Sequence, residues 1–216
     1  MRPYIIRQGD YLTKLGHTMG FDPDAVWNNP KNQGLKERRP DRDMLHPGDL
    51  LWVPDAPDAK RLIVKNGTTN RYAANIPKKA IEVRVQVGGE ALAKEPYSIL
   101  GLGPDPIEGE TDEQGWIKTK VDVHVREVEV ILTRKNRTLR VRVGDLDPID
   151  TLSGLRKRLF HLGFYKPARI SADNEDVTEG GTLIAALKAF QSSKGLPATG
   201  KLDDETKKAL TGAHGS

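Results

Sequence analysis

Hydrophobic residues near the start of the chain have helical spacing and lie between two short runs that are typical of β-strands. The two runs are residues 4–7 and 50–53. Between them, Leu12, Leu15 and Met19 recur every three or four positions, which places them on one face of a helix. We therefore expect a strand, a helical region and a closing strand in this part of the chain.

Capping residues predict where the helices of this first segment begin and end. Asp10 is expected to cap the first helix, and Gly20 is expected to end it. Asp22 precedes a proline, a combination that commonly opens a helix, and Trp27 is expected to face inward from this second helix. The prediction for residues 1–55 is a small βααβ module.

Apolar and polar residues alternate with a period of two over the next part of the chain, which predicts a half-buried antiparallel sheet. The alternating apolar positions are Ile81, Val83, Val85 and Val87, then Val121, Val123 and Val125, then Val128, Val130 and Leu132, and finally Leu139, Val141 and Val143. The last two runs are expected to pair as a hairpin across residues 134–137. Residues 60–146 are therefore predicted to form an antiparallel β-sandwich or a small barrel.

Four residues of this middle segment have more specific expectations. Asp112 and Gly115 predict a hairpin turn. Trp116 is expected to pack against the sheet, with stacking on a sugar as the alternative. His124 alternates with valines, so we expect it on the solvent face of a strand.

Helical spacing returns in the last third of the chain. The buried face of the first helix there is predicted from four leucines, Leu152, Leu155, Leu159 and Leu162. Asp150 or Thr151 is the expected cap, and Gly163 the expected end. Residues 156–158 are basic, lie mostly outside the leucine stripe and are expected to form a solvated face.

Two further helices complete the prediction for this last segment. The second helix is expected to begin at a Thr182 cap, with three inward residues, Leu183, Leu187 and Phe190. The third is expected to begin at Asp203 or Asp204 and to end near Leu210. Residues 148–212 are thus predicted to be a three-helix module, and the whole chain to be an α+β multidomain protein.

The net charge of the chain and its distribution limit the classes of partner that we expect it to bind. The chain has 216 residues, with 34 Lys and Arg against 30 Asp and Glu, a net charge of +4. Because the basic residues are interspersed with acidic ones and are not gathered in runs, we expect no nucleic-acid partner. A mildly basic surface suits an anionic polymer or an acidic protein.

The residue types and motifs that the sequence lacks exclude several kinds of site and reaction. The sequence has no cysteine, which excludes disulfides, thiolate zinc sites and cysteine nucleophiles. No apolar run approaches the ~20 residues of a membrane span, so we expect no membrane insertion. The N-terminus lacks the apolar stretch of a Sec signal peptide. The five histidines have no metal-ligand spacing and no Gly-x-Ser-x-Gly elbow occurs, so we expect no enzyme, no metal and no cofactor.

The first segment resembles a LysM module. The resemblance is carried by residues 4–12 (YIIRQGDYL), 28–30 (NNP) and 45–54 (LHPGDLLWVP). It implies a βααβ fold that binds N-acetylglucosamine-containing glycans in a groove between two loops. The glycan-binding residues that it implies are Gly9, Asp10, Tyr11, Leu12, Met44, Leu45 and His46. The alternative is that the Gly-Asp and Pro-Gly pairs only shape turns. A charged loop at 33–43 departs from the family pattern and borders the implied groove.

The last segment resembles the peptidoglycan-binding domain that accompanies cell-wall hydrolases and envelope proteins. The resemblance is carried by residues 151–165, 181–191 and 194–206. It implies a three-helix unit with a shallow surface cavity near the first loop and the start of the second helix. The loop before that helix departs from the family pattern, because it is longer and acidic. Its acidic residues are Asp173, Glu175, Asp176 and Glu179.

The middle segment adds a third resemblance, which bears on partners. Residues 89–97 and 109–117 are similar to parts of a β domain that occurs beside such modules in proteins associated with type VI secretion spikes. Together the resemblances imply a non-catalytic protein that binds peptidoglycan or another N-acetylglucosamine-containing glycan and anchors a secretion-system or effector partner to the bacterial cell wall. The alternative is a protein–protein adaptor of the spike or baseplate that binds no glycan. On either interpretation the chain is made in the cytoplasm and acts in the periplasm, the envelope or an exported apparatus.

Overall fold

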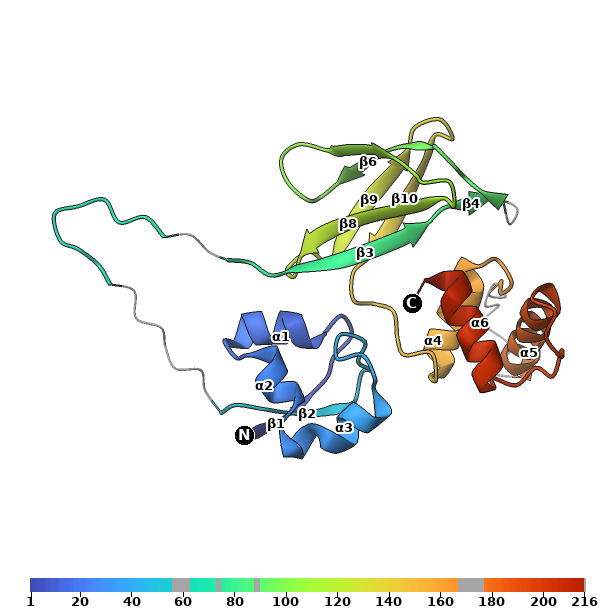
Figure 1. Cartoon of the computed structure of the whole chain (residues 1–216), viewed down its shortest axis with the longest axis horizontal. Coiled ribbons are helices and arrows are strands. Elements are labelled where there is room, and N and C mark those ends of the chain that lie inside the picture. Colours follow the sequence, from blue (N-terminus) through green and yellow to red (C-terminus); the bar gives the residue numbers. More distant parts are fainter. Residues whose placement is uncertain (56–62, 73–74, 88–89, 167–176, 216) are drawn as a thin grey trace.

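The computed structural model describes residues 1–55, 63–72, 75–87, 90–166 and 177–215, without the side chains of residues 177–181. The described residues contain three clusters of buried apolar side chains, one in each third of the chain. Figure 1 shows a helical module near the N-terminus, a body of strands and a helical module at the C-terminus. The fold is therefore mixed, with helices at both ends of the chain and antiparallel sheets.

The N-terminal module has two strands that pair antiparallel, β1 (Arg2–Ile5) and β2 (Leu50–Val53). Between them lie α1 (Leu12–Met19), α2 (Pro23–Trp27), the 3₁₀ turn η1 (Pro30–Asn32) and α3 (Gln33–Arg38). The Asp22 carboxylate caps α2 by accepting from the backbone N–H of Asp24, and Gly20 ends α1 in the left-handed conformation, as the sequence predicted.

Two local predictions in this module were wrong. Asp10 does not cap α1. Its carboxylate accepts hydrogen bonds from the Tyr4 hydroxyl at 2.8 Å and from the Arg7 N–H at 3.0 Å, and it thereby holds the preceding turn. The predicted charged loop at 33–43 begins with α3, because Leu35 is buried in the core and gives that segment an apolar anchor.

The middle domain is built from short antiparallel strands. The predicted hairpin is present as β9 (Glu127–Leu132) and β10 (Arg137–Arg142), with Val130 opposite Leu139. β6 (Pro96–Leu100) and β7 (Ile107–Glu110) extend this sheet in the order β10-β9-β6-β7. Two further pairs complete the domain: β3 (Lys78–Arg84) with β8 (Trp116–Asp122), and β4 (Gln86–Val87) with β5 (Glu90–Ala91).

Two expectations for the middle domain need correction. Asp112 and Gly115 do form a turn, in which the Asp112 carboxylate accepts from the backbone N–H of Trp116 at 2.8 Å. That turn joins β7 to β8, which lie in different sheets, so it is not a hairpin turn. His124 is exposed as expected, but it lies in a turn, because β8 ends at Asp122.

The C-terminal module contains α4 (Leu152–His161), α5 (Val177–Ser193) and α6 (Asp204–His214). Thr151 caps α4 and Asp203 caps α6, each accepting from a backbone N–H three residues ahead. The core includes Leu159 and Phe190, both fully buried. Among the described residues, no helix has both the length and the apolar character that crossing a membrane requires.

Helix boundaries and one face of the C-terminal module differ from the predictions. α5 already includes Val177, so Thr182 lies within the helix and is not its cap. Leu152 is 68% exposed at the first position of α4, so it does not belong to the buried stripe. The acidic residues Asp173, Glu175 and Asp176, and the side chain of Glu179, lie outside the described residues.

Candidate functional site

The two loops that the LysM resemblance implies as glycan-binding lie next to each other. The Leu12 N–H donates to the Arg42 carbonyl at 3.3 Å, and the Thr13 N–H donates to the Asp43 carboxylate at 2.9 Å. Of the seven implied residues, Tyr11, Leu12 and Leu45 are buried. The other four, Gly9, Asp10, Met44 and His46, are half-buried. The structure thus brings the implied residues together along one edge of the N-terminal module.

This edge contacts the other two modules. The Tyr11 hydroxyl donates to the Val123 carbonyl at 3.2 Å, and the backbone of Gly144 packs against the Tyr11 ring. Burial, and then the nearby Asp43 carboxylate, raise the pKa of Tyr11 to about 12, so the hydroxyl stays protonated and donates. On the other loop, the Met44 sulfur accepts from the Arg158 guanidinium at 3.3 Å. Tyr11 is consequently 2% exposed, and a sugar cannot contact its ring in this arrangement.

A second set of contacts fixes the same modules through charged groups. Arg39 is buried and donates to Asp49 in its own module and to Asp150 ahead of α4, at 2.8 Å and 2.9 Å. Burial raises the pKa of Asp49, but the hydrogen bonds from Arg39 and from the His46 N–H outweigh it, so the pKa lies below its usual value. Lys79 on β3 pairs with Asp43 at 3.0 Å. These ion pairs join all three modules near the base of the β domain.

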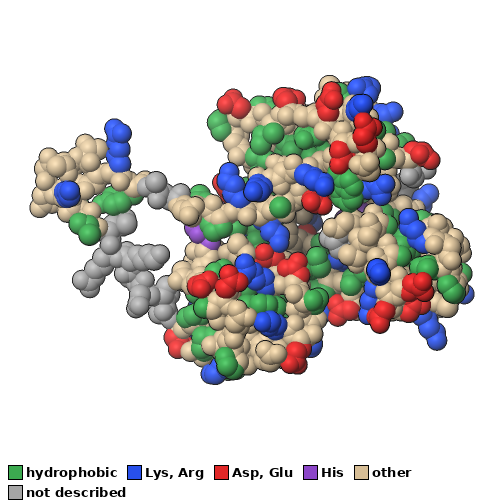
Figure 2. Space-filling view, viewed as in Figure 1, with side chains coloured by type: hydrophobic (Ala, Val, Ile, Leu, Met, Phe, Trp, Pro, Cys, Tyr) green, Lys and Arg blue, Asp and Glu red, His purple; other side chains and the backbone are tan. Residues whose placement is uncertain are grey.

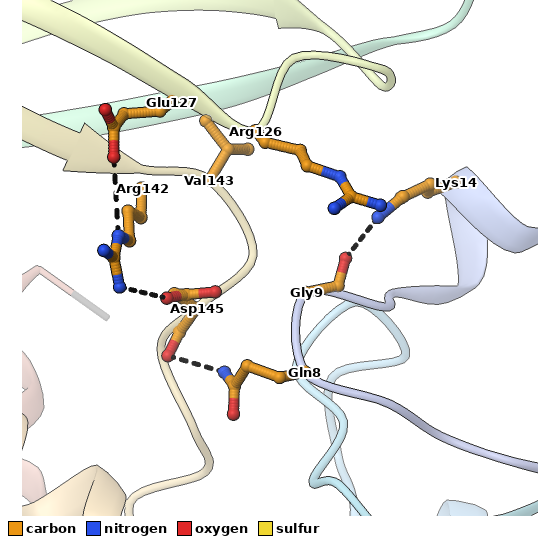
Figure 3. A pocket seen from close by; sticks show the side chains of 8 residues that line it. All are labelled: Gln8, Gly9, Lys14, Arg126, Glu127, Arg142, Val143 and Asp145. Carbon is orange, nitrogen blue, oxygen red and sulfur yellow. Dashed lines mark hydrogen bonds and ion pairs between the residues drawn. The ribbon is translucent and has the colours of Figure 1, made fainter.

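A small cavity of about 300 Å³ opens beside Gly9, between the N-terminal module and the β domain (Figure 3). It is lined by Gln8, Gly9, Lys14, Arg126, Glu127, Arg142, Val143 and Asp145. Gln8 donates to the Asp145 carbonyl at 3.2 Å, and Arg142 lies between the carboxylates of Glu127 and Asp145. Three cationic side chains against two carboxylates give the cavity a small positive excess, which suits a single anionic group.

A larger cavity of about 810 Å³ lies where the three modules meet. Its walls come from Asp43 and Met44 of the N-terminal module, from β3 and β10, and from the C-terminal ends of α4 and α6. Lys and Arg side chains gather along the margin of the β domain that faces the two helical modules (Figure 2). The cavity is within the size range of ligand sites, which is roughly 300–1,000 Å³.

A pair of histidines lies at the helical wall of this cavity. His161 at the end of α4 and His214 at the end of α6 approach with Nδ1 and Nε2 2.9 Å apart, in hydrogen-bond geometry. Burial, followed by the neighbouring His161 and Arg158, lowers the pKa of His214 to about 4. The pKa of His161 is lowered as well, so at neutral pH both rings are uncharged and one ring N–H donates to the nitrogen of the other ring. Among the described residues no third histidine or carboxylate joins it as a metal site.

Lowering the pH from 7 to 5 is expected to destabilise the C-terminal module through His214. Its folded pKa of about 4 lies below the ordinary value near 6.5, so between these values the unfolded state holds a proton that the folded state does not. The free energy of unfolding should fall by about 1–2 kcal/mol over this interval. Urea unfolding at the two pH values measures it. His214→Gln should lose less, and an equal loss in both proteins would contradict this assignment.

The C-terminal module has a buried polar centre at Gln191 of α5. The side-chain amide donates to the hydroxyls of Thr199 and Thr206 and to the Lys201 carbonyl, and its oxygen accepts from the Gly200 N–H at 2.8 Å. Gln191 therefore fastens the connector between α5 and α6 from inside. Nothing in the spacing of the sequence singled it out, because a glutamine next to Phe190 also suits an exposed helical position.

The open surface of this module carries an apolar side chain beside that connector. Ile184 on α5 is 49% exposed. Gly200 passes close to it: a Cβ at Gly200 would lie 2.8 Å from the Ile184 Cγ2 and 3.0 Å from the Lys188 Cε. Ile184, Lys188 and Gly200 thus form one continuous patch with an apolar centre and a cation at its margin, which we call the α5 patch.

Arg158 departs most from the sequence prediction. Residues 156–158 were expected on a solvated face, but Arg158 is fully buried and donates to the Asp147 carbonyl at 2.8 Å and to the Gly154 carbonyl at 3.0 Å. Burial lowers its pKa to about 10, while Asp147 and Asp150 oppose that shift. The guanidinium therefore remains charged at neutral pH. Its hydrogen bonds hold the segment that leads into α4 against the helix.

Comparison with known proteins adds evidence for the last third of the chain. Residues 151–210, which span α4, α5 and most of α6, match the model of a family described as "Putative peptidoglycan binding domain". Searches of curated proteins and of solved structures gave no match. The match agrees with the resemblance seen in the sequence at the same residues. The C-terminal module of this protein is therefore similar to peptidoglycan-binding domains, and peptidoglycan is its indicated ligand.

Proposed function

We propose that this protein is a non-catalytic peptidoglycan-binding protein and that its C-terminal module makes the contact. One observation carries the proposal: residues 151–210 match a peptidoglycan-binding family, and the same residues form a module with its own core. A packed core of this kind supplies a rigid surface for a polymer, which is what an anchoring domain needs. The chain then holds whatever it carries at the cell wall.

The α5 patch is the described surface that best suits this ligand. Peptidoglycan offers apolar sugar faces and carboxylates, and the patch offers exposed Ile184 with the Lys188 ammonium on the next turn. Ile184 and Lys188 lie in the middle of α5, and Gly200 lies in the connector between α5 and α6. We therefore assign Ile184 to contact with the sugar face and Lys188 to a carboxylate. Both residues act in binding, and neither takes part in a catalysed reaction.

The contacts that the N-terminal module makes with the rest of the chain favour a second candidate function. Its implied glycan-binding edge is occupied by contacts with the chain's own β domain and C-terminal module, through Tyr11 and Met44. This observation supports a module that organises the chain and presents it to a protein partner, as an adaptor does. The finer proposal of a link to a contractile, type VI-like apparatus rests on the resemblance of residues 89–97 and 109–117. On this proposal the protein acts in the envelope or in an exported assembly.

Retention on insoluble peptidoglycan sacculi tests the proposed function. The purified full-length chain should be retained at low and at near-physiological salt, and soluble muropeptides should release it. Ile184→Asp should weaken retention about tenfold, because losing one apolar contact costs about 1–2 kcal/mol. Leu152→Asp is the matched control, since it changes a similarly exposed apolar residue on α4 and should bind like the wild type.

The salt dependence decides how a positive result is interpreted. Retention that disappears at near-physiological salt would show a protein of charge +4 adhering to an anionic polymer without a specific site. Retention that Leu152→Asp weakens as much as Ile184→Asp would contradict the α5 patch. No retention at either salt would leave the adaptor function as the better account.

A further inference from the structure

A long connection, residues 54–77, joins the N-terminal module to the β domain. It runs from the end of β2 to the start of β3, and its described residues form no helix or strand. Connections longer than roughly 12–15 residues without secondary structure usually have a function. Figure 1 shows residues 63–72 of this connection lying away from both modules. We call these residues, which the structure describes without a gap, the linker loop.

The linker loop is closed by its own hydrogen bonds. The Tyr72 hydroxyl donates to the Ile63 carbonyl at 2.8 Å, which joins the two ends of the loop. Inside it, the Asn70 side chain accepts from the Lys65 N–H and donates to the Lys65 carbonyl, both at 2.9 Å. Among the described residues, no hydrogen bond or ion pair connects the loop to the rest of the chain. The linker loop is therefore organised locally, like other compact surface loops.

The linker loop exposes three large apolar or aromatic side chains. Ile63 is 83% exposed, Val64 65% and Tyr72 51%. Among the residues that the structure describes, no other large apolar side chain is as exposed as Ile63. Removing such side chains from water is favourable, and a cluster of them on a protein surface marks an interaction site. The loop therefore presents an apolar surface to a partner outside the chain.

The charged side chains of the linker loop are all positive. Lys65 and Arg71 are exposed, and no described carboxylate pairs with either of them. In the sequence, residues 59–81 contain six Lys and Arg and no Asp or Glu, so this segment is an exception to the interspersed charges of the chain. Figure 2 likewise shows hydrophobic and basic side chains, without acidic ones, on the visible face of the loop. This charge favours an anionic partner.

The combination of an apolar surface and positive charge favours a lipid bilayer over other anionic partners. A nucleic acid or an anionic polysaccharide would pair with the cations of the loop but would leave Ile63 and Val64 exposed to water. At a bilayer, aliphatic side chains enter the boundary between headgroups and acyl chains, and tyrosine suits the headgroup level. Lys and Arg remain at the surface, where they are attracted to anionic lipids.

We propose that the linker loop binds the surface of an anionic lipid bilayer. Ile63 and Val64 insert between the headgroups, and Tyr72 lies at their level. Lys65 and Arg71 pair with lipid phosphates. This binding is peripheral, so it differs from the membrane span that the sequence excludes and that no described helix could form. Because the α5 patch belongs to another module, one chain can hold a bilayer and peptidoglycan at the same time.

Sedimentation with lipid vesicles tests the proposal on the full-length chain. The probes are vesicles of equal parts phosphatidylglycerol and phosphatidylcholine, with pure phosphatidylcholine as the uncharged comparison. The chain should bind the anionic vesicles at least about tenfold more tightly. Ile63→Asp should weaken that binding at least about tenfold, because it removes an inserted apolar group and adds a repelled charge. Ile184→Asp makes the same change on the α5 patch and should bind vesicles like the wild type.

Lysine substitutions test the contribution of charge. Lys65→Gln should weaken binding to the anionic vesicles about fivefold at low salt, and by less as salt screens the surface. The matched control is Lys120→Gln, which removes an exposed lysine of β8 that has no ion pair with a described residue. It should change binding by less than about twofold, because it lies outside the loop.

A fluorescent label separates insertion of the loop from adhesion of the protein. Because the sequence has no cysteine, Val64→Cys can be labelled at that position alone with the environment-sensitive dye NBD. The emission of the dye should rise several-fold when anionic vesicles are added, since the dye leaves water. The same dye attached to Ile184→Cys should change little.

Several results would overturn the proposal. They are the absence of sedimentation with anionic vesicles, equal losses of binding in Ile63→Asp and Ile184→Asp, and a dye at residue 64 that does not respond while the protein binds. An oligonucleotide whose binding falls as much in Ile63→Asp as vesicle binding does would also overturn it, because the loop would then bind anionic polymers in general. Ile63→Asp should still be retained on sacculi like the wild type, so failure of either proposal leaves the other standing.

Discussion

Gly154→Ala is expected to destabilise the C-terminal module by about 3 kcal/mol. A Cβ at Gly154 would lie 2.6 Å from the Asp147 carbonyl oxygen and closer still to that of Pro148. Both atoms belong to backbone that Arg158 and Thr151 hold in place, so they cannot move away without breaking hydrogen bonds. Overpacking of this kind costs about 1–3 kcal/mol or more, beyond the helix propensity that alanine gains. Amide hydrogen exchange across α4 measures the change locally, without assuming two-state unfolding of three modules.

Gly212→Ala is the matched control for that substitution. Gly212 lies in α6, and a Cβ there would have no neighbour within 4 Å. The same chemical change should therefore stabilise α6 by up to about 1 kcal/mol, because alanine favours the helix over glycine. If Gly154→Ala and Gly212→Ala changed the stability of the module in the same direction, this would contradict the close approach of the carbonyl groups of residues 147–148 to Gly154.

Arg158→Met is expected to cost about 3–5 kcal/mol and to loosen the contact between modules. The substitution keeps an apolar stem of similar length but removes a buried cation that donates to the Asp147 and Gly154 carbonyls and to the Met44 sulfur. Removing one partner from a buried polar cluster leaves the remaining groups unsatisfied, which is the costly case. Hydrogen exchange should show lost protection both in α4 and near Met44.

The control for this variant is an arginine that the structure leaves exposed. Arg126→Met makes the same change on the rim of the small cavity and should alter stability by no more than about 0.5 kcal/mol. Arg158→Lys should recover part of the loss, because it restores the charge but not the forked geometry of the donors. A cost for Arg158→Met as small as that for Arg126→Met would mean that the guanidinium is solvated after all.

Elements with a clear period were predictable from the sequence. The β9–β10 hairpin was predicted because valine and leucine alternate over two runs of the right length, although β10 already begins at Arg137, inside the predicted turn. The caps Asp22, Thr151 and Asp203 were found at or beside their predicted positions, because their side chains satisfy helix N–H groups locally. These features depend on residues that are close together in the sequence, so the sequence alone predicts them.

Features that depend on contacts between modules were not predictable in the same way. Arg158 was expected to face solvent, since its burial depends on carbonyls of residues 147 and 154 that fold back over it. Tyr11 was implied to face a glycan, yet its hydroxyl donates to the β domain, more than a hundred residues away in sequence.

The structure supports a division of labour along the chain. The C-terminal module is similar to peptidoglycan-binding domains, whereas the N-terminal module uses its loop edge to contact the other modules. The ion pairs of Arg39 with Asp49 and Asp150 hold that arrangement across the module boundary. The loop edge of the N-terminal module is thereby fixed against the other modules, whereas Ile184 of the α5 patch remains exposed.

The measurement that tests the central claim most directly is hydrogen exchange of the full-length chain, followed by mass spectrometry, with and without soluble peptidoglycan fragments. The account predicts new protection within residues 151–210, strongest around Ile184 and Gly200, and no change within residues 1–55. Protection confined to the loop edge around Tyr11 and Met44 would contradict it, and so would binding of the fragments that leaves residues 151–210 unprotected.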